Sequence, residues 1–248
     1  MKLYIAYFDF LGYKNFILNN GSEHLHTRVG HILRDIETSL SLGNLKKNLR
    51  EVFIADLSNS HINCFNFSDT VLFWTNDNSI ESFTELLKVS YRFNWNEVCY
   101  NFPVRGTIIF DEFEQISGSN ENQVGGTYVV KCIYGKGLLK AYQKTENLNW
   151  AGCVIDNSVI SELKNHGDYT DLLNQYAIEY SVPYKITPQN HKPEYALRLV
   201  DGKINKTAFK NRCDGIVQSF SSDSKDADQP RAKTLLDNTI KFLECVIE

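Results

Sequence analysis

The sequence predicts an α/β (α+β) fold of the ferredoxin-like type, in which a βαββαβ unit forms a sheet with helices on one face. Three observations predict this fold. An apolar strand begins at residue 3, amphipathic helical patterns follow at 22–41 and 79–100, and a strand pair joined by the polar corner Ser68-Asp69 lies between them. The chain has 248 residues, of which 42 % are hydrophobic, so it is long and apolar enough for a sizeable core.

The first half of the chain supplies the elements of this unit in order. Gly12 ends the first strand in a turn, and apolar residues at helical spacing then indicate the two long helices. The expected elements are a strand at 3–10, a helix at 22–41, extended segments at 52–57 and 62–67, a strand at 71–74, a helix at 79–100 and a strand at 104–110.

The second half has weaker patterns. Residues 111–126 are polar and rich in Gly, Asn and Ser, which predicts a loop. The elements expected after it are an extended segment at 128–134, helices at 137–145 and from about 157, strands at 153–155 and 195–200, a helix at 208–219, a polar linker at 221–230 and a helix at 234–247. We expect one domain over residues 1–165 and a C-terminal α/β extension, 166–248, packed on it.

The composition excludes several classes of protein. A formal net charge of −4 argues against general nucleic-acid binding, which requires a basic surface. No apolar run approaches the length of a membrane-spanning helix, and no cleavable leader is evident. The six cysteines are scattered, without metal-binding spacing, and several lie in apolar runs typical of reduced core residues. We expect a cytoplasmic protein that binds neither nucleic acid nor membrane.

Two aspartates stand out at strand ends. Asp9 interrupts an aromatic strand, where a carboxylate is costly to bury without a cation or strong donors, and Asp69 lies on the hairpin corner. Neighbouring strands of a ferredoxin-like sheet would bring both carboxylates to one edge. Mg²⁺ and Mn²⁺ prefer such oxygen ligands and often share them with phosphate oxygens. The alternative is structural, with Asp9 capping a helix near Gly12 and Asp69 forming a turn.

Four segments resemble motifs of one enzyme superfamily. FDFLGYKNF (8–16) resembles the opening metal-binding motif of class III nucleotide cyclases, and FSDTVLFW (67–74) resembles their second metal-binding hairpin, with Ser68-Asp69 in place of Gly-Asp. VRGTIIFDEF (104–113) and YGKGLLKAYQKTE (134–146) are similar to a strand and a helix of the Pycsar antiphage pyrimidine cyclases of bacteria. The resemblance covers roughly residues 3–156 and implies a class III cyclase core.

This resemblance implies roles for the residues in the first two motifs. Asp9 and Asp69 would hold two Mg²⁺ or Mn²⁺ ions per site, one helping to activate the ribose 3′-hydroxyl and the other neutralising the departing pyrophosphate. Nucleotide binding would fall to a further group of residues, of which the first three would meet the triphosphate through their backbone: Phe10, Leu11, Gly12 and Ser68.

The positions that read the base differ from those of purine cyclases. Phe65 and Cys132 stand where those enzymes carry a Lys and an Asp, so readout of ATP or GTP by that pair is not expected. Phe65 would instead stack on a pyrimidine ring. The alternative is that both residues simply face the core from their strands.

The cation that stabilises the transition state also differs. The Asn and Arg of the family's helix fall near Leu139 and Gln143 here, so another cation must act. Arg105 and Lys140 are the candidates that we favour. Arg105 lies on a strand between apolar residues and would need an anionic partner, whereas Lys140 and its neighbours Lys136 and Lys144 also fit a solvated helix face.

The resemblance implies a homodimeric pyrimidine nucleotide cyclase that converts UTP, or CTP, to the 3′,5′-cyclic monophosphate and pyrophosphate. Each active site would combine residues of both chains, and the product would signal to a separate cyclic-nucleotide-sensing effector in antiphage defence. One alternative is a cyclase-like nucleotide sensor with impaired catalysis. The other is a nucleotidyl cyclase or transferase with a different base preference, although a diguanylate-type enzyme would carry a GGDEF-like motif that this chain lacks.

Overall fold

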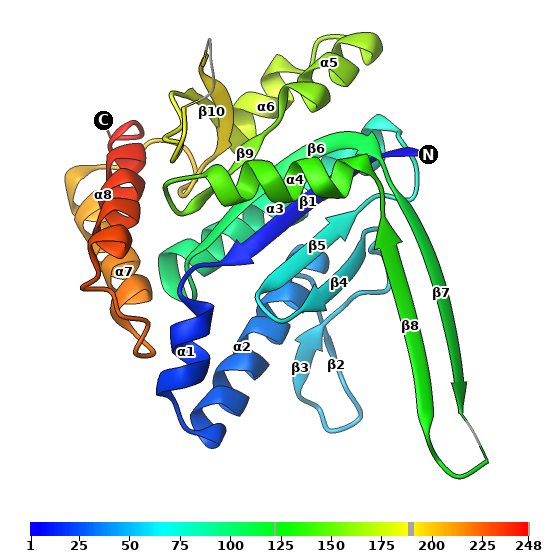
Figure 1. Ribbon diagram of the computed structural model, residues 1–248. Coiled ribbons are helices and arrows are strands. Elements are labelled where there is room, and N and C mark those ends of the chain that lie inside the picture. Colours follow the sequence, from blue (N-terminus) through cyan, green and yellow to red (C-terminus); the bar gives the residue numbers. More distant parts are fainter. Residues whose placement is uncertain (122, 188–190, 248) are drawn as a thin grey trace.

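The computed structural model describes residues 1–121, 123–187 and 191–247. Within these residues one large sheet has the strand order β10-β11-β9-β6-β1-β5-β4 (Figure 1). Its strands are β1 (Lys2–Phe10), β4 (Asn63–Phe67), β5 (Thr70–Trp74), β6 (Val104–Glu112), β9 (Gly152–Ile155), β10 (Ala177–Tyr180) and β11 (Glu194–Leu197). The helices are α1 (Tyr13–Asn19), α2 (Ser22–Leu40), α3 (Ile80–Tyr100), α4 (Lys136–Asn147), α5 (Asn157–His166), α6 (Thr170–Tyr176), α7 (Lys206–Ser221) and α8 (Pro230–Glu244).

The predicted ferredoxin-like unit forms the centre of this sheet. β1 lies between β6 and β5 and is antiparallel to both, and β4 pairs with β5 in the predicted hairpin. Ser68 adopts a left-handed conformation, with φ of 54°, at the hairpin corner. The α+β fold class predicted from the sequence is therefore confirmed.

Helices cover both faces of the sheet. Side chains alternate across β1, so Tyr4 and Tyr7 point to opposite faces. The Tyr4 ring lies 4.9 Å from the ring of Phe83 on α3, whereas the Tyr7 ring lies 6.1 Å from that of Tyr142 on α4. α2 packs on α3, as expected for the two long helices. The expectation of helices on one face is wrong for α4, which covers the face that carries Asp9.

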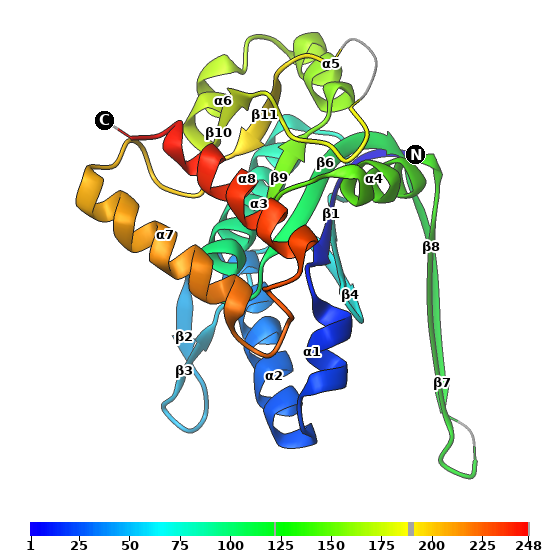
Figure 2. The same ribbon diagram turned by 60° about the vertical axis from the view of Figure 1, so that its left-hand side comes forward.

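The prediction of a loop at 111–126 is wrong. β6 continues to Glu112, and β7 (Glu114–Glu121) pairs with β8 (Thr127–Tyr134) in a two-stranded ribbon that projects from the body of the protein (Figures 1 and 2). The strands of this ribbon satisfy their backbone hydrogen bonds with each other rather than by joining the buried sheet. The side chains of β7 are therefore mostly polar, which is why composition indicated a loop, whereas β8 matches the extended segment expected at 128–134. Asn122 lies outside the described residues.

A second, smaller ribbon lies near α2. It pairs β2 (Leu45–Lys47), which was not expected, with β3 (Phe53–Ala55), which lies within the segment 52–57 expected to be extended. Both ribbons carry exposed apolar side chains, with Leu49 and Phe53 on the smaller one and Ile116 and Val129 on the larger one.

The C-terminal part continues the main sheet. β10 and β11 extend it beyond β9, and neither α6 nor β10 was expected from the sequence. α7 packs on α3 so closely that a Cβ at Gly215 would lie 2.6 Å from the Cys99 carbonyl oxygen. The segment 221–230 is not the free polar linker that composition indicated, since the Asp223 side chain is 6 % exposed and that of Lys225 3 %. The division at 165/166 stays a prediction.

No helix in the described part of the chain is both long and apolar enough to cross a membrane.

Candidate functional site

Asp9 and Asp69 lie at the same edge of the sheet. Asp9 is the penultimate residue of β1, opposite Thr70 of β5, and Asp69 immediately precedes that strand. The Phe10 N–H donates a hydrogen bond to the Asp69 carbonyl at 2.9 Å, which fixes the hairpin corner against the end of β1. Sixty residues apart in sequence, the two aspartates line one cavity of about 550 Å³.

This cavity is built from distant parts of the chain. Its lining comes from the end of β1 and the start of α1, from Arg105 of β6 and Glu146 of α4, and from the segment that leads into α8. Its charged lining residues are Asp9, Lys14, Asp69, Arg105, Glu146, Lys225, Asp226 and Arg231.

Arg105 is held between two carboxylates. It stands directly opposite Asp9 in the β1–β6 register, and its Nε donates to Asp9 Oδ2 at 2.8 Å. Its Nη1 donates to the Glu146 carbonyl at 3.0 Å, and Nη2 forms an ion pair with the Glu146 carboxylate. The Arg105 side chain is only 5 % exposed, so it has the anionic partners that its position on an apolar strand required.

Burial dominates the electrostatics of Asp9. It raises the pKa of this carboxyl from 3.8 to about 6, against the opposing charge and hydrogen bond of Arg105, while Glu146 and Asp69 raise the pKa further. Asp69 is different, because its carboxylate makes no hydrogen bond or ion pair with any described residue. Arg105 thus binds the carboxylates of Asp9 and Glu146, whereas the carboxylate of Asp69 is open to a ligand.

The donor set suits a divalent ion that is shared with a substrate. The described residues contain no group of three or more His, Cys, Asp and Glu side chains that could hold a metal ion. Two carboxylates fit the preference of Mg²⁺ for a few oxygen ligands together with waters and phosphate oxygens, rather than for a cage made entirely of protein. Asp9 and Asp69 thus fit Mg²⁺ or Mn²⁺ bound together with a phosphorylated ligand.

The backbone of residues 10–12 borders the same cavity. The amide N–H groups of Phe10 and Leu11 are already donated to the carbonyls of Asp69 and Pro103. Gly12 has φ of 81° and precedes α1, and a Cβ at this position would lie 3.1 Å from Cβ of Lys225. Glycine is therefore needed both for the turn and for the close approach of the C-terminal segment.

The other expected nucleotide-binding residues lie outside this cavity. Ser68 is exposed at the hairpin corner. Phe65 on β4 is partly buried on the face covered by α4, and the ammonium of Lys131 lies 5.9 Å from its ring centroid. Cys132 is exposed on the projecting ribbon, opposite Ile116. Within one chain, none of the three lines the cavity of Asp9 and Asp69.

The lysines of α4 are all engaged elsewhere. Lys140 pairs with Asp111, at the opposite end of β6 from Arg105, and borders a different cavity of about 540 Å³. Lys136 pairs with Glu112 at 3.0 Å, and Lys144 pairs with Asp156 at 2.6 Å and with Glu194. Among the described residues of α4, Glu146 is the only one that lines the cavity of Asp9.

Several residues that line the cavity were missed in the sequence. Glu146 is the final residue of the motif at 134–146, so the motif gave a signal for it. Lys225 and Arg231 lie in a segment whose composition indicated only a linker, and nothing in their local pattern placed them near residue 9.

We expect Asp9 to titrate near pH 6 in the metal-free protein. Since its folded pKa lies above the value for an unfolded chain, its contribution to stability is fully present below pH 3.8 and is lost as the pH rises through 6. Carboxyl ¹³C chemical shifts measured against pH would show this titration. Mg²⁺ should lower the apparent pKa of Asp9, because the cation favours the ionised carboxylate.

The Asp111 carboxylate, which pairs with Lys140 outside the cavity, is the control for this titration and should not respond to Mg²⁺. An Asp9 pKa near 4 that is unaffected by Mg²⁺ would contradict both the electrostatic environment and the metal site.

Two solved structures with a similar fold are guanylyl cyclase domains. The catalytic core of a rhodopsin-guanylyl cyclase with converted specificity, in complex with ATPαS, is 6 % identical, with a TM-score of 0.51, covering 79 % of this chain and 94 % of that one. The dimeric guanylyl cyclase domain of the RhoGC fusion protein from the aquatic fungus Blastocladiella emersonii is 8 % identical, with a TM-score of 0.51 and coverage of 79 % and 93 %. No protein-family model and no curated protein matches the sequence. At this identity the similarity shows the fold alone: the chain has the class III cyclase fold.

Proposed function

We propose that this chain is a nucleotide cyclase that converts UTP or CTP to the 3′,5′-cyclic monophosphate and pyrophosphate. The observation that carries the proposal is the meeting of Asp9 and Asp69 in one cavity on the class III cyclase fold. The cavity, of about 550 Å³, is within the usual size range of small-molecule sites.

In this proposal Asp9 and Asp69 hold Mg²⁺ or Mn²⁺, two ions per site. When bound, such ions neutralise phosphate charge and make a nearby hydroxyl easier to deprotonate. Arg105 orients the Asp9 carboxylate through its Nε and favours the ionised form, which is the form that binds a cation. Asp69, without a partner in the described chain, is available to the ion at no cost in protein contacts. Catalysis then comes from positioning and from charge stabilisation.

The proposed preference for a pyrimidine rests on the two residues at the positions that read the base in purine cyclases. Phe65 and Cys132 offer neither the cation nor the anion expected for purine recognition. The Phe65 ring is partly buried and faces the side of the sheet on which Asp9 lies. An aromatic ring stacks on any base and contributes about 1–3 kcal/mol per base.

A homodimer would complete the site. Phe65, Cys132 and Lys140 lie outside the cavity of Asp9 in their own chain, so we propose that each active site receives them from the second protomer. The projecting β7–β8 ribbon supports such an assembly, since the exposed fractions of its Ile116 and Val129 are 61 % and 77 %. The cyclic product would act on a separate effector in antiphage defence in a bacterial cytoplasm.

A cyclase-like nucleotide sensor is the second candidate, and one observation favours it. Arg105 already neutralises Asp9, and α4 brings no cation to the cavity. A chain that binds a nucleotide through Asp69 and does not turn it over would fit this arrangement.

Incubation of the purified protein with each of the four common nucleoside triphosphates and Mn²⁺ tests these functions. We expect a cyclic pyrimidine monophosphate, identified by mass spectrometry, and at least about tenfold less product from ATP or GTP, since the purine-reading charges are absent. Nucleotide binding without product in calorimetry would support the sensor. Neither product nor binding would contradict both functions.

A further inference from the structure

We propose that the C-terminal segment completes the substrate site, with Arg231 of α8 acting together with Lys14 of α1 as a binding site for the polyphosphate of the nucleotide. This inference rests on the proposed function. Both side chains line the cavity of Asp9 and Asp69, although they lie 217 positions apart in the sequence.

Arg231 and Lys14 are the cations of this cavity that have no protein partner. Arg105 is bound to Asp9 and Glu146, and Lys225 is bound to Asp223. By contrast, the side chains of Arg231 and Lys14 make no hydrogen bond or ion pair with any residue that the structure describes. An unpaired guanidinium at the wall of a cavity is suited to an anion, because its planar fork matches two phosphate oxygens at once.

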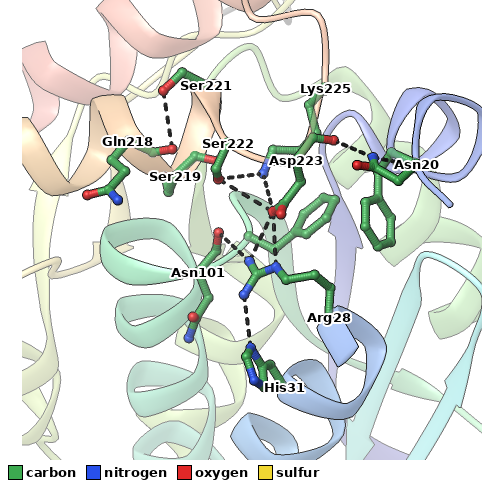
Figure 3. A network of polar contacts seen from close by, with 12 residues as sticks. Asn20, Arg28, His31, Asn101, Gln218, Ser219, Ser221, Ser222, Asp223 and Lys225 are labelled. Atoms are coloured by element: carbon green, nitrogen blue, oxygen red, sulfur yellow. Dashed lines mark hydrogen bonds and ion pairs between the residues drawn. The ribbon is translucent and has the colours of Figure 1, made fainter. Parts of the chain in front are cut away.

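The segment that carries Arg231 is firmly anchored. The Asp223 carboxylate accepts from Nε of Arg28 at 3.1 Å and contacts His24 at 2.9 Å, and the Asp223 carbonyl accepts from the Asn20 side chain at 2.8 Å. Figure 3 shows Asp223 of the α7–α8 turn between Lys225 of the same turn and Arg28 of α2. The turn lies beside α1 (Figure 2), so the start of α8 has a defined position.

Lys225 belongs both to the network around Asp223 and to the lining of the cavity. Its ammonium lies 4.2 Å from the ring centroid of Phe102 and 3.3 Å from the Asp223 carboxylate, and its stem packs over Gly12. Burial lowers the pKa of Lys225 to about 8, against the charge of Asp223. Lys225 therefore stabilises the turn, and Arg231, at the start of α8, is the cation of this segment that can bind a ligand.

α8 is fixed at its other contacts as well. Pro230 opens the helix, and Thr239 Oγ1 accepts a hydrogen bond from the Ala151 amide at 2.8 Å. Arg231, the second residue of this helix, lines the same cavity as Asp9 and Asp69. Arg231 and Lys14 thus add two cations to the cavity that Asp9 and Asp69 line, and a metal-bound polyphosphate requires both kinds of charge.

Titration with inorganic tripolyphosphate in the presence of Mg²⁺, followed by calorimetry, tests the inference on the full chain. Replacing Arg231 by alanine should weaken the binding of tripolyphosphate and of UTP by the same factor, about 10-fold or more, since charge-assisted hydrogen bonds to phosphate oxygens are lost. The Arg231→Lys variant should keep part of the affinity, and Lys14→Ala should add to the loss in the double variant.

Lys233→Ala is the matched control. Lys233 lies two residues further along α8, is exposed, pairs with Asp228 and does not line the cavity, so its loss should change affinity less than twofold. If Arg231→Ala binds both ligands as tightly as the wild type does, this inference is overturned and the proposed function is unaffected. A loss seen with UTP and absent with tripolyphosphate would overturn the assignment to phosphate. Failure of the wild type to bind either ligand would overturn the inference and the proposed function together.

Discussion

The Asp69→Asn variant is expected to lose cyclic nucleotide formation by about 100-fold or more, because a metal that stabilises charge in the transition state loses half of its protein carboxylates. The same change should leave the fold intact. Asp69 lies at a hairpin corner, and its carboxylate contacts no described residue through a hydrogen bond or ion pair, so no structural interaction is lost. Product formed from UTP and CTP with Mn²⁺, together with the thermal midpoint of unfolding, would measure both effects.

Asp69 gives a cleaner test than Asp9. Replacing Asp9 would leave Arg105 without its cross-strand partner, so activity and stability would change together. Asp226→Asn removes the same charge from an exposed position in the same cavity and should keep activity within about threefold, as surface charge changes are generally small in effect. Equal losses in Asp69→Asn and Asp226→Asn would mean that the charge of the cavity matters and that Asp69 is not a metal ligand.

The Arg105→Ala variant is expected to lose about 3 kcal/mol of unfolding free energy, because removing one partner of a buried ion pair leaves a charge without compensation. Two carboxylates would remain side by side, with Asp9 only 14 % exposed and Glu146 39 % exposed. Urea unfolding at pH 7 would measure the loss. Mg²⁺ should restore part of it and should stabilise the variant more than the wild type, because the ion can take the place of the guanidinium between the carboxylates.

Lys136→Ala is the control for this effect. It also removes the cation of an ion pair, but both side chains are largely exposed, so the expected cost is at most about 1 kcal/mol. Similar costs for the two variants, or equal stabilisation of both by Mg²⁺, would contradict the role of Arg105 as the cation that holds Asp9.

Much of the central unit was accessible from the sequence. Three elements could be assigned without knowledge of their neighbours, because the pattern of apolar and polar residues within each one indicates its type. They are the apolar strand at 3–10, the hairpin around Ser68-Asp69 and the helix at 79–100. The placement of Asp9 and Asp69 at one edge followed from a single topological step, since β1 and β5 are adjacent in this fold.

The strand β7 and the buried position of the segment 221–230 could not be found in this way, although β8 matches the extended segment expected at 128–134. β7 is polar because its partner is one strand and not a core, and its composition is that of a loop. Lys225 looks like a residue of a linker, yet it is buried against Phe102 and Gly12, which are 123 and 213 positions earlier in the chain.

The ferredoxin-like order of strands and helices and the two aspartates at the strand ends can be read from the sequence, because local periodicity and residue chemistry encode them. The position of Arg105 between Asp9 and Glu146, and that of Arg231 at the same cavity, become visible only in the folded chain. The reason is physical: these neighbours are set by sheet register and by packing between segments some 40 to 220 residues apart, which no short-range pattern records.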